Sequence, residues 1–113
     1  MKIVVDDATH ALANLDEAEP FDLAFIDADK PSSTIYFKEA ERLVRPGGVI
    51  IVDNVVRHGL IADPEVKDGD DASCYGIREL LGYVKGSNRV EATTIATVGS
   101  KGHDGFMYAV KIE

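Results

Sequence analysis

The sequence has no tryptophan, only one cysteine, four prolines and few basic residues. Its single cysteine, Cys74, cannot form an internal disulfide, so we expect a reducing compartment and a cytoplasmic protein. No apolar run approaches the ~18–20 residues of a membrane span. The first residues include no apolar stretch long enough for a secretory signal. These absences argue against a disulfide-rich secreted fold and against a helical membrane protein.

Acidic residues outnumber basic ones, with twenty Asp and Glu against twelve Lys and Arg and a formal net charge of −8. An acidic surface repels phosphate backbones and anionic lipid, so we expect neither nucleic acid nor a membrane as a partner. A metal cation or a small molecule held at a local site fits this charge better. The 113 residues are 45% hydrophobic and 28% charged, which is typical of one globular domain.

Short apolar runs alternate with amphipathic stretches, and this order predicts an α/β fold with a mostly parallel sheet. We expect strands at Ile3–Val5, Phe21–Asp27 and Val49–Val52. Between them, helical spacing predicts one helix from Ala8 that is closed by Pro20. A second helix starts at Ser32 or Ser33 and ends at Pro46-Gly47-Gly48.

The second half of the chain begins with residues 55–73, which are rich in Asp and Gly, and we interpret them as a lid or binding loop. Apolar residues at helical spacing then predict a helix that ends at Gly86. Alternating patterns over Val90–Val98 and Phe106–Ile112 predict a terminal antiparallel hairpin around the connection 99–105.

Two of the predicted strands end in acidic residues, which are candidates for a metal site. Asp27 ends one strand, and Asp53-Asn54 ends the next. The carboxyl ends of neighbouring parallel strands meet at one edge of a sheet, where ligands bind in open α/β folds. Three oxygen donors there suit Mg²⁺, Mn²⁺ or Ca²⁺. The alternative is structural: Asp27 caps the next helix, and Asp53-Asn54 forms an Asx turn.

Lys30 follows Asp27 on the same predicted loop, in the motif Asp27-Ala28-Asp29-Lys30. A cation nearby would lower the pKa of this lysine and make it a candidate general base. The alternative is an exposed lysine paired with Asp29. No nucleophile-elbow motif and no Cys-x-x-Cys motif occur, so covalent catalysis has no support.

A nucleotide-type α/β domain carries a Gly-rich turn after its first strand, and this sequence has none. Asp6-Asp7-Ala8 stands at that point, and no G-x-G-x-x-G occurs anywhere. Either the domain is of another kind, or its first half is missing.

Two motifs resemble one known family. They are the segment from Phe21 to Lys30, with its D-A-D-K ending, and the segment from Arg45 to Asn54, with G-G-V-I-x-x-D-N. Both are similar to the metal-dependent, S-adenosylmethionine-using O-methyltransferases of the catechol and caffeoyl-CoA type. The similarity continues through Gly76-Ile77-Arg78 and Asp104-Gly105-Phe106 and covers essentially the whole chain.

The resemblance implies a role for each matching residue. Asp27, Asp53 and Asn54 match the metal ligands, and Lys30 matches the residue that helps to deprotonate the acceptor hydroxyl. The cofactor contacts match four further positions: Asp7, Ala8, Asp29 and Tyr36. The implied activity is transfer of a methyl group from S-adenosylmethionine to a catechol-like or phenolic hydroxyl, with Mg²⁺ or another divalent cation as cofactor.

The resemblance also implies a partial fold. Residues 1–113 would form a single partial domain, the C-terminal half of a Rossmann-like class I methyltransferase fold, without the Gly-rich cofactor-binding half. One edge of the strand at 21–27 would then lack its neighbour, so we expect a homo-oligomer formed through this edge or by exchange of the N-terminal segment. Ser33 and Arg57 stand where the family commonly has aromatic residues, so the acceptor pocket would differ.

Two other functions compete with the enzyme. One is a truncated, non-catalytic half-domain that folds or oligomerises and at most binds a cation. The other is a phosphoacceptor receiver domain, suggested by the acidic pair Asp6-Asp7 and by Asp27 after a buried strand. In a receiver domain, a full β-α unit should separate these motifs, whereas only nineteen residues lie between Asp7 and Asp27.

Overall fold

The computed structural model describes residues 8–15, 18, 20–59, 61–67, 69, 71–99 and 102–112. The predicted strand at 3–5 lies outside these residues. Over the described part, the element order is α1 (Ala8–Ala13), β1 (Phe21–Ile26), the 3₁₀ turn η1 (Lys30–Ser32), α2 (Ser33–Leu43), β2 (Val44–Asp53), the 3₁₀ turn η2 (Arg57–Gly59), α3 (Ala72–Lys85), β3 (Val90–Gly99) and β4 (Gly102–Lys111).

The four described strands form one mixed sheet in the order β1-β2-β4-β3. β1 and β2 are parallel, with Ile26 opposite Val52. β4 lies antiparallel to β2, with Val52 opposite Met107, and also antiparallel to β3. The predicted α/β order, the parallel pair and the terminal antiparallel hairpin are confirmed. The prediction of a mostly parallel sheet is wrong for the described strands, because β4 runs antiparallel to both of its neighbours.

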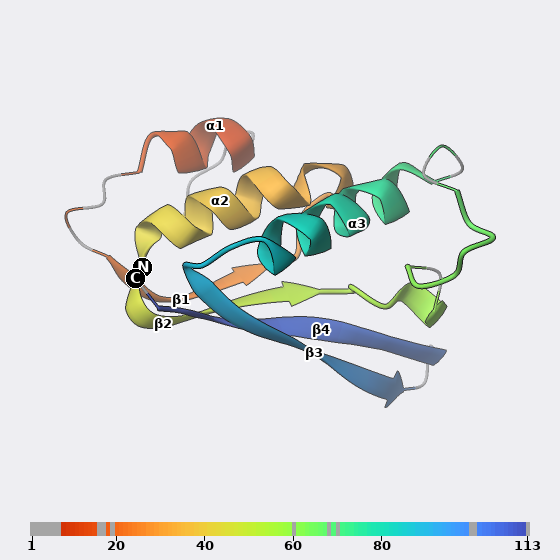
Figure 1. Ribbon diagram of the computed structural model, residues 1–113. Coiled ribbons are helices and arrows are strands. Elements are labelled where there is room, and N and C mark those ends of the chain that lie inside the picture. The colour runs from red at the N-terminus through yellow and green to blue at the C-terminus, as the bar shows by residue number, and fades with distance from the viewer. Residues whose placement is uncertain are drawn as a thin grey trace.

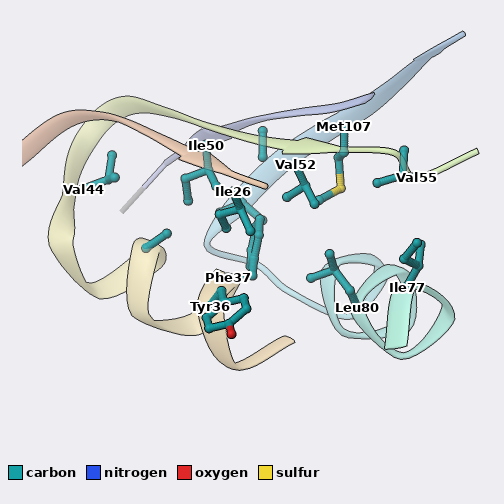
Figure 2. Close-up of a cluster of buried hydrophobic side chains, with 13 residues drawn as sticks. Ile26, Tyr36, Phe37, Val44, Ile50, Val52, Val55, Ile77, Leu80 and Met107 are labelled. Atoms are coloured by element: carbon teal, nitrogen blue, oxygen red, sulfur yellow. The ribbon is translucent and has the colours of Figure 1, made fainter. Parts of the chain in front are cut away.

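Helices α2 and α3 lie side by side on the same face of the sheet (Figure 1). Their apolar stripes meet the strands in one core, and Phe37 of α2 is fully buried at its centre (Figure 2). Ile77 and Leu80 of α3 are also fully buried, as the predicted helical stripe requires. The sheet contributes Ile50, Val52 and Met107 to this core.

The opposite face of the sheet has no described helix packed on it (Figure 1). Side chains alternate along a strand, so residues next to the buried ones point to this second face. Phe21, Leu23 and Phe25 of β1 are 48%, 56% and 59% exposed, and Tyr108 of β4 is 38% exposed. A sheet that contains a parallel pair normally has both faces covered, so this apolar face is unusual.

Three predicted boundaries are wrong by a few residues. Helix α2 ends at Leu43 rather than at Pro46, and Val44 is already extended. Proline has no N–H for the helix and disfavours the helical conformation of the residue before it, which accounts for the early end. Helix α3 begins at Ala72, inside the predicted loop, because the Asp71 side chain accepts hydrogen bonds from the amides of Ser73 and Cys74.

The hairpin is longer than predicted. The ladder continues to the pair Gly99 and Gly102, and Asp104 and Gly105 belong to β4 rather than to a connection at 99–105. The hydrogen bonds between β3 and β4 extend the strands through this stretch, and the apolar pattern of its sequence is too weak to predict them. Among the described helices, none has the length and apolar character needed to cross a membrane.

Candidate active site

The carboxyl ends of β1 and β2 bring together three of the residues predicted for the site. Because Ile26 pairs with Val52, Asp27 and Asp53 are the next residues on adjacent parallel strands. Lys30 lies between them: its Nζ donates a hydrogen bond of 2.6 Å to the backbone oxygen of Asp53. The same Nζ lies 4.0 Å from Oδ1 of Asp27. The predicted meeting of these strand ends is therefore confirmed.

Lys30 is buried, with 8% of its surface exposed, and it does not form the surface pair with Asp29 that was the alternative. Burial lowers the pKa of Lys30, against the carboxylates of Asp27 and Asp53, which raise it. The nearby Arg57 lowers the pKa further. A lysine that is desolvated and close to acidic residues is typical of active sites.

The position of Lys30 depends on Gly76 of α3. A Cβ atom at residue 76 would lie 2.2 Å from the Lys30 carbonyl oxygen and 2.7 Å from Cα of Pro31. Helix α3 can therefore pack directly on η1 only with glycine at this point. The resemblance included Gly76 without explaining it, and the close approach supplies the reason.

Asn54 has a left-handed backbone, with φ of 60°, and Arg57 has φ of 51°. Such conformations are uncommon for residues other than glycine and persist only where the surroundings enforce them. Asp104 does so here. Its Oδ1 accepts hydrogen bonds from the amides of Val56 (3.2 Å), Arg57 (2.8 Å) and Gly105 (2.8 Å), and its Oδ2 accepts one from Asn54 Nδ2 (3.1 Å).

Burial raises the pKa of Asp104, but the hydrogen bonds from Arg57, Gly105, Asn54 and Val56 outweigh this effect and hold it below its usual value. Asp104 thus remains an anion that fixes the loop after β2. The bond to Nδ2 also leaves Oδ1 as the atom that Asn54 can offer to a cation. The role of Asp104 is not visible in the sequence, because its partner Asn54 lies fifty residues away in the chain.

Asp53, Asp27 and Asn54 offer two carboxylates and one amide oxygen, which is a donor set suited to a hard divalent cation. Asp53 Oδ1 accepts a hydrogen bond from the Asn54 amide, so part of the local turn predicted as the alternative is present as well. Among the described residues, no group of three or more His, Cys, Asp or Glu side chains gathers in one place. A cation here would depend on the amide of Asn54.

Asp29 and Tyr36, two of the residues predicted to contact the cofactor, lie next to Lys30 and form a hydrogen-bonded pair. The Tyr36 hydroxyl donates a short hydrogen bond to Oδ1 of Asp29. This bond, followed by one from the Ser32 hydroxyl, lowers the pKa of Asp29. Ser32 stands at the N-cap of α2 as predicted, but its side chain makes no capping hydrogen bond. Ser33 is buried.

A groove of about 440 Å³ connects these residues with α1. Ala8 lines it from α1, and Asp27, Ala28 and Tyr36 line it from the other side. The structure thus brings Ala8 and Tyr36, both predicted for cofactor binding, to one groove. Asp7, the fourth predicted cofactor residue, lies outside the described residues.

The loop predicted as a lid is tied to α3 over the part that is described. Arg78 donates hydrogen bonds to the carbonyl oxygens of Ile61 (3.0 Å), Asp63 (3.0 Å) and Val66 (2.6 Å). One planar guanidinium therefore holds three backbone positions of this loop beside the site.

Comparison with known proteins agrees with this geometry. The sequence model of the O-methyltransferase family matches residues 1–112. A catechol O-methyltransferase of Mycobacterium tuberculosis is 43% identical over 110 residues, which are 97% of this chain and 48% of that protein. The chain belongs to the O-methyltransferase family. It spans about half the length of the curated relatives that it matches.

Solved structures show the same fold. The O-methyltransferase TomG from Streptomyces achromogenes, in complex with SAM, superposes with a TM-score of 0.86 at 43% identity over 95% of this chain and 48% of TomG. The O-methyltransferase from Bacillus cereus, in complex with SAH, gives 0.80 at 45% identity over 92% of this chain and 46% of that chain. The fold is therefore part of a class I methyltransferase fold, as the sequence predicted.

Proposed function

We propose that this chain supplies the metal-holding and proton-accepting part of an S-adenosylmethionine-dependent O-methyltransferase that acts on a catechol-like or phenolic hydroxyl. The observation that carries the proposal is the parallel register of β1 and β2. It sets Asp27 beside Asp53-Asn54, with the Nζ of the buried Lys30 hydrogen-bonded to the Asp53 carbonyl oxygen and 4.0 Å from the Asp27 carboxylate. The named relatives that methylate catechol support the substrate class.

Asp27, Asp53 and Asn54 would hold Mg²⁺ or another divalent cation. When bound, such a cation lowers the pKa of a hydroxyl that it touches and orients it. Lys30 Nζ, as the neutral amine that burial favours, would take the hydroxyl proton and become an ammonium group. S-adenosylmethionine, once bound, would supply the methyl group to the acceptor oxygen, and its sulfur would keep the electron pair of the broken carbon–sulfur bond as a neutral thioether.

On the cofactor side, we propose that Asp29 and Tyr36 contact the methionine portion of S-adenosylmethionine and that Asp7 and Ala8 flank its adenine. The hydrogen bond between Tyr36 and Asp29 keeps the carboxylate charged and fixed in place, which suits it to an ammonium group. The groove between α1 and β1 supports this placement. We also propose a cytoplasmic location, in line with the buried free thiol of Cys74.

The test is calorimetric titration of the folded chain with S-adenosylhomocysteine, first with Mg²⁺ present and then with EDTA. We expect binding that Asp29→Asn weakens at least tenfold, because this change removes the carboxylate proposed to contact the ammonium group of the cofactor. The matched control is Asp63→Asn, on the loop held by Arg78. Absence of binding by a protein that is still folded would contradict the proposal for this chain.

A second candidate, the non-catalytic half-domain that oligomerises, is favoured by one observation. The apolar face of β1 is exposed, and in the described part of the sheet β1 pairs with β2 along one edge. Such an edge is a template for another chain. This candidate expects self-association without cofactor binding, so the calorimetric test separates it from the enzyme.

A further inference from the structure

A hollow of about 470 Å³ lies at the end of the molecule opposite the candidate active site. It forms where α2 ends and β2 begins, and the C-terminal parts of α3 and β4 close it. Val44 pairs with Phe21 and Val52 with Ile26, so the two ends of β2 lie five residues apart along β1, which at ~3.3 Å per residue is roughly 17 Å. Six side chains line this cationic hollow: Lys38, Glu41, Arg42, Tyr83, Arg89 and Lys111.

Four of these six side chains are cations, in a chain with a net charge of −8. Arg42 is paired with Glu39, at 2.7 Å. Within the described part of the chain, Lys38, Arg89 and Lys111 have no ion pair. Lys111 Nζ donates to the Val44 carbonyl oxygen, and Lys38 Nζ lies 5.0 Å above the Tyr83 ring. An excess of positive charge therefore surrounds the hollow.

Glu41 is the one carboxylate in the lining, and only 3% of its surface is exposed. Its Oε2 accepts a hydrogen bond of 2.8 Å from the Tyr83 hydroxyl. Its Oε1 is buried and has no hydrogen-bond partner among the described residues. A buried acceptor without a donor costs about 1–3 kcal/mol, so a ligand that brings a proton to Oε1 would relieve this cost.

We propose that this cationic hollow binds a phosphate group that carries a proton, either as inorganic phosphate or as a phosphomonoester. The ligand must satisfy two demands at once. Its negative charge meets Lys38, Arg89 and Lys111, and its P–OH donates a hydrogen bond to Glu41. A simple cation would satisfy Glu41 but not the surrounding lysine and arginine side chains.

The acceptor at Glu41 also gives the hollow a way to discriminate between anions. Sulfate has the size and shape of phosphate but carries no proton near neutral pH, so its oxygens would face a carboxylate with no hydrogen between them. The mismatch leaves two acceptors in contact, and an unmet buried hydrogen bond of this kind is a strong basis for rejection. The site would therefore bind phosphate and exclude sulfate.

The experiment follows the backbone amide signals of the 113-residue chain by NMR during titration at pH 6.0 and constant ionic strength. Inorganic phosphate, glycerol 3-phosphate and sulfate are the three probes. A phosphomonoester is about half protonated at this pH, since its second pKa is about 6. We expect both phosphates to shift the amide signals of residues around the hollow. Their dissociation constants should be at least tenfold lower than that of sulfate. Tighter binding of inorganic phosphate indicates a free ion, and tighter binding of the ester indicates a phosphorylated small molecule.

Two variants and one control sharpen the test. Arg89→Gln removes an exposed cation and should weaken phosphate binding about tenfold, the effect of losing one charge-assisted hydrogen bond. Glu41→Gln keeps the side-chain size but can donate as well as accept, so the preference for phosphate over sulfate should fall to about one. Lys85→Gln removes an exposed cation outside the hollow and should change neither the affinity for phosphate nor the affinity for sulfate.

Three results would overturn the proposal. The first is equal titration of the wild-type chain by phosphate and sulfate, which indicates general attraction of anions. The second is shifts that arise away from the hollow, and the third is the same loss of affinity in Lys85→Gln as in Arg89→Gln. Arg89 is exposed, so its substitution leaves the core intact. The proposal can therefore be tested with Arg89→Gln even if the Glu41→Gln variant does not fold.

Discussion

At the scale of single residues, Asp104 governs the geometry of the candidate site most directly. It accepts four hydrogen bonds: two from the amides of Val56 and Arg57 in the loop after β2, one from the amide of Gly105 in β4, and one from the Asn54 side chain. A proposed metal ligand is therefore oriented by a residue from the neighbouring strand β4. Outer partners of this kind commonly affect metal affinity as much as the ligands do.

We predict that Asp104→Ala lowers the free energy of unfolding by about 2 kcal/mol, because it leaves three amides without an acceptor. Urea denaturation followed by circular dichroism measures the change. Glu91→Ala, at an exposed position of β3, is the matched control and should stay within about 0.5 kcal/mol of the wild type. Equal effects of the two substitutions would show that Asp104 does not hold the loop.

At the scale of elements, the contact of α3 with η1 positions Lys30. We predict that Gly76→Ala destabilises the protein by about 2 kcal/mol or more, because its Cβ meets backbone atoms that cannot move aside. Gly82→Ala, in the same helix with nothing within 4 Å of the added Cβ, should stabilise it by about 0.5–1 kcal/mol. Thermal unfolding of the two variants measures both changes, and the same sign for both would contradict the prediction.

The N-terminus of α3 gives a prediction about pH. Hydrogen bonds from the amides of Cys74 and Ser73 lower the pKa of Asp71. A carboxylate whose pKa is lower in the folded state adds stability above its unfolded pKa, near 3.8, and this stability is lost as the pH falls through the folded value.

We therefore predict that Asp71→Asn, which keeps an acceptor but removes the charge, melts at a lower temperature than the wild type at pH 7. The difference should shrink as the pH falls below 3.8 and through the lowered pKa of folded Asp71. Melting curves from pH 2.5 to pH 7 measure it. A difference that stays constant with pH would show that the charge of Asp71 does not contribute.

At the scale of the whole molecule, the two faces of the sheet differ. One face is covered by α2 and α3 (Figure 1). The other exposes Phe21, Leu23 and Phe25 of β1. Contiguous exposed apolar surface of this kind marks an interaction site or an aggregation hazard. The prediction of a homo-oligomer rests on this surface and on the length of the relatives, which is about twice that of this chain.

We predict that the chain self-associates in sedimentation velocity experiments at micromolar concentration and that Phe25→Lys shifts it toward the monomer. A charge on an edge strand disfavours pairing with another chain. The control is Ile35→Lys, which places the same charge at an exposed apolar residue of α2, away from the sheet. A wild-type chain that sediments as a monomer at every concentration would contradict the prediction.

The sequence by itself determined the order of elements and the strand ends that carry Asp27 and Asp53. Local periodicity and the motifs around them report which residues face a core and where a strand stops. It could not determine the exact ends of α2 and α3, because a proline two residues ahead and the Asp71 cap act through hydrogen bonds that periodicity does not contain.

Only the tertiary structure decided the contacts between residues far apart in the chain. Asp104 lies about fifty residues from its partner Asn54, and Tyr83 lies about forty from Glu41. Gly76 of α3 packs against the backbone of Lys30 in η1. The burial of Lys30 also follows from the packing of α3 on η1 and not from its charged neighbours. Hydrogen bonding and burial depend on positions in space, which a local pattern of residue types does not encode, so these features became visible only once the chain was folded.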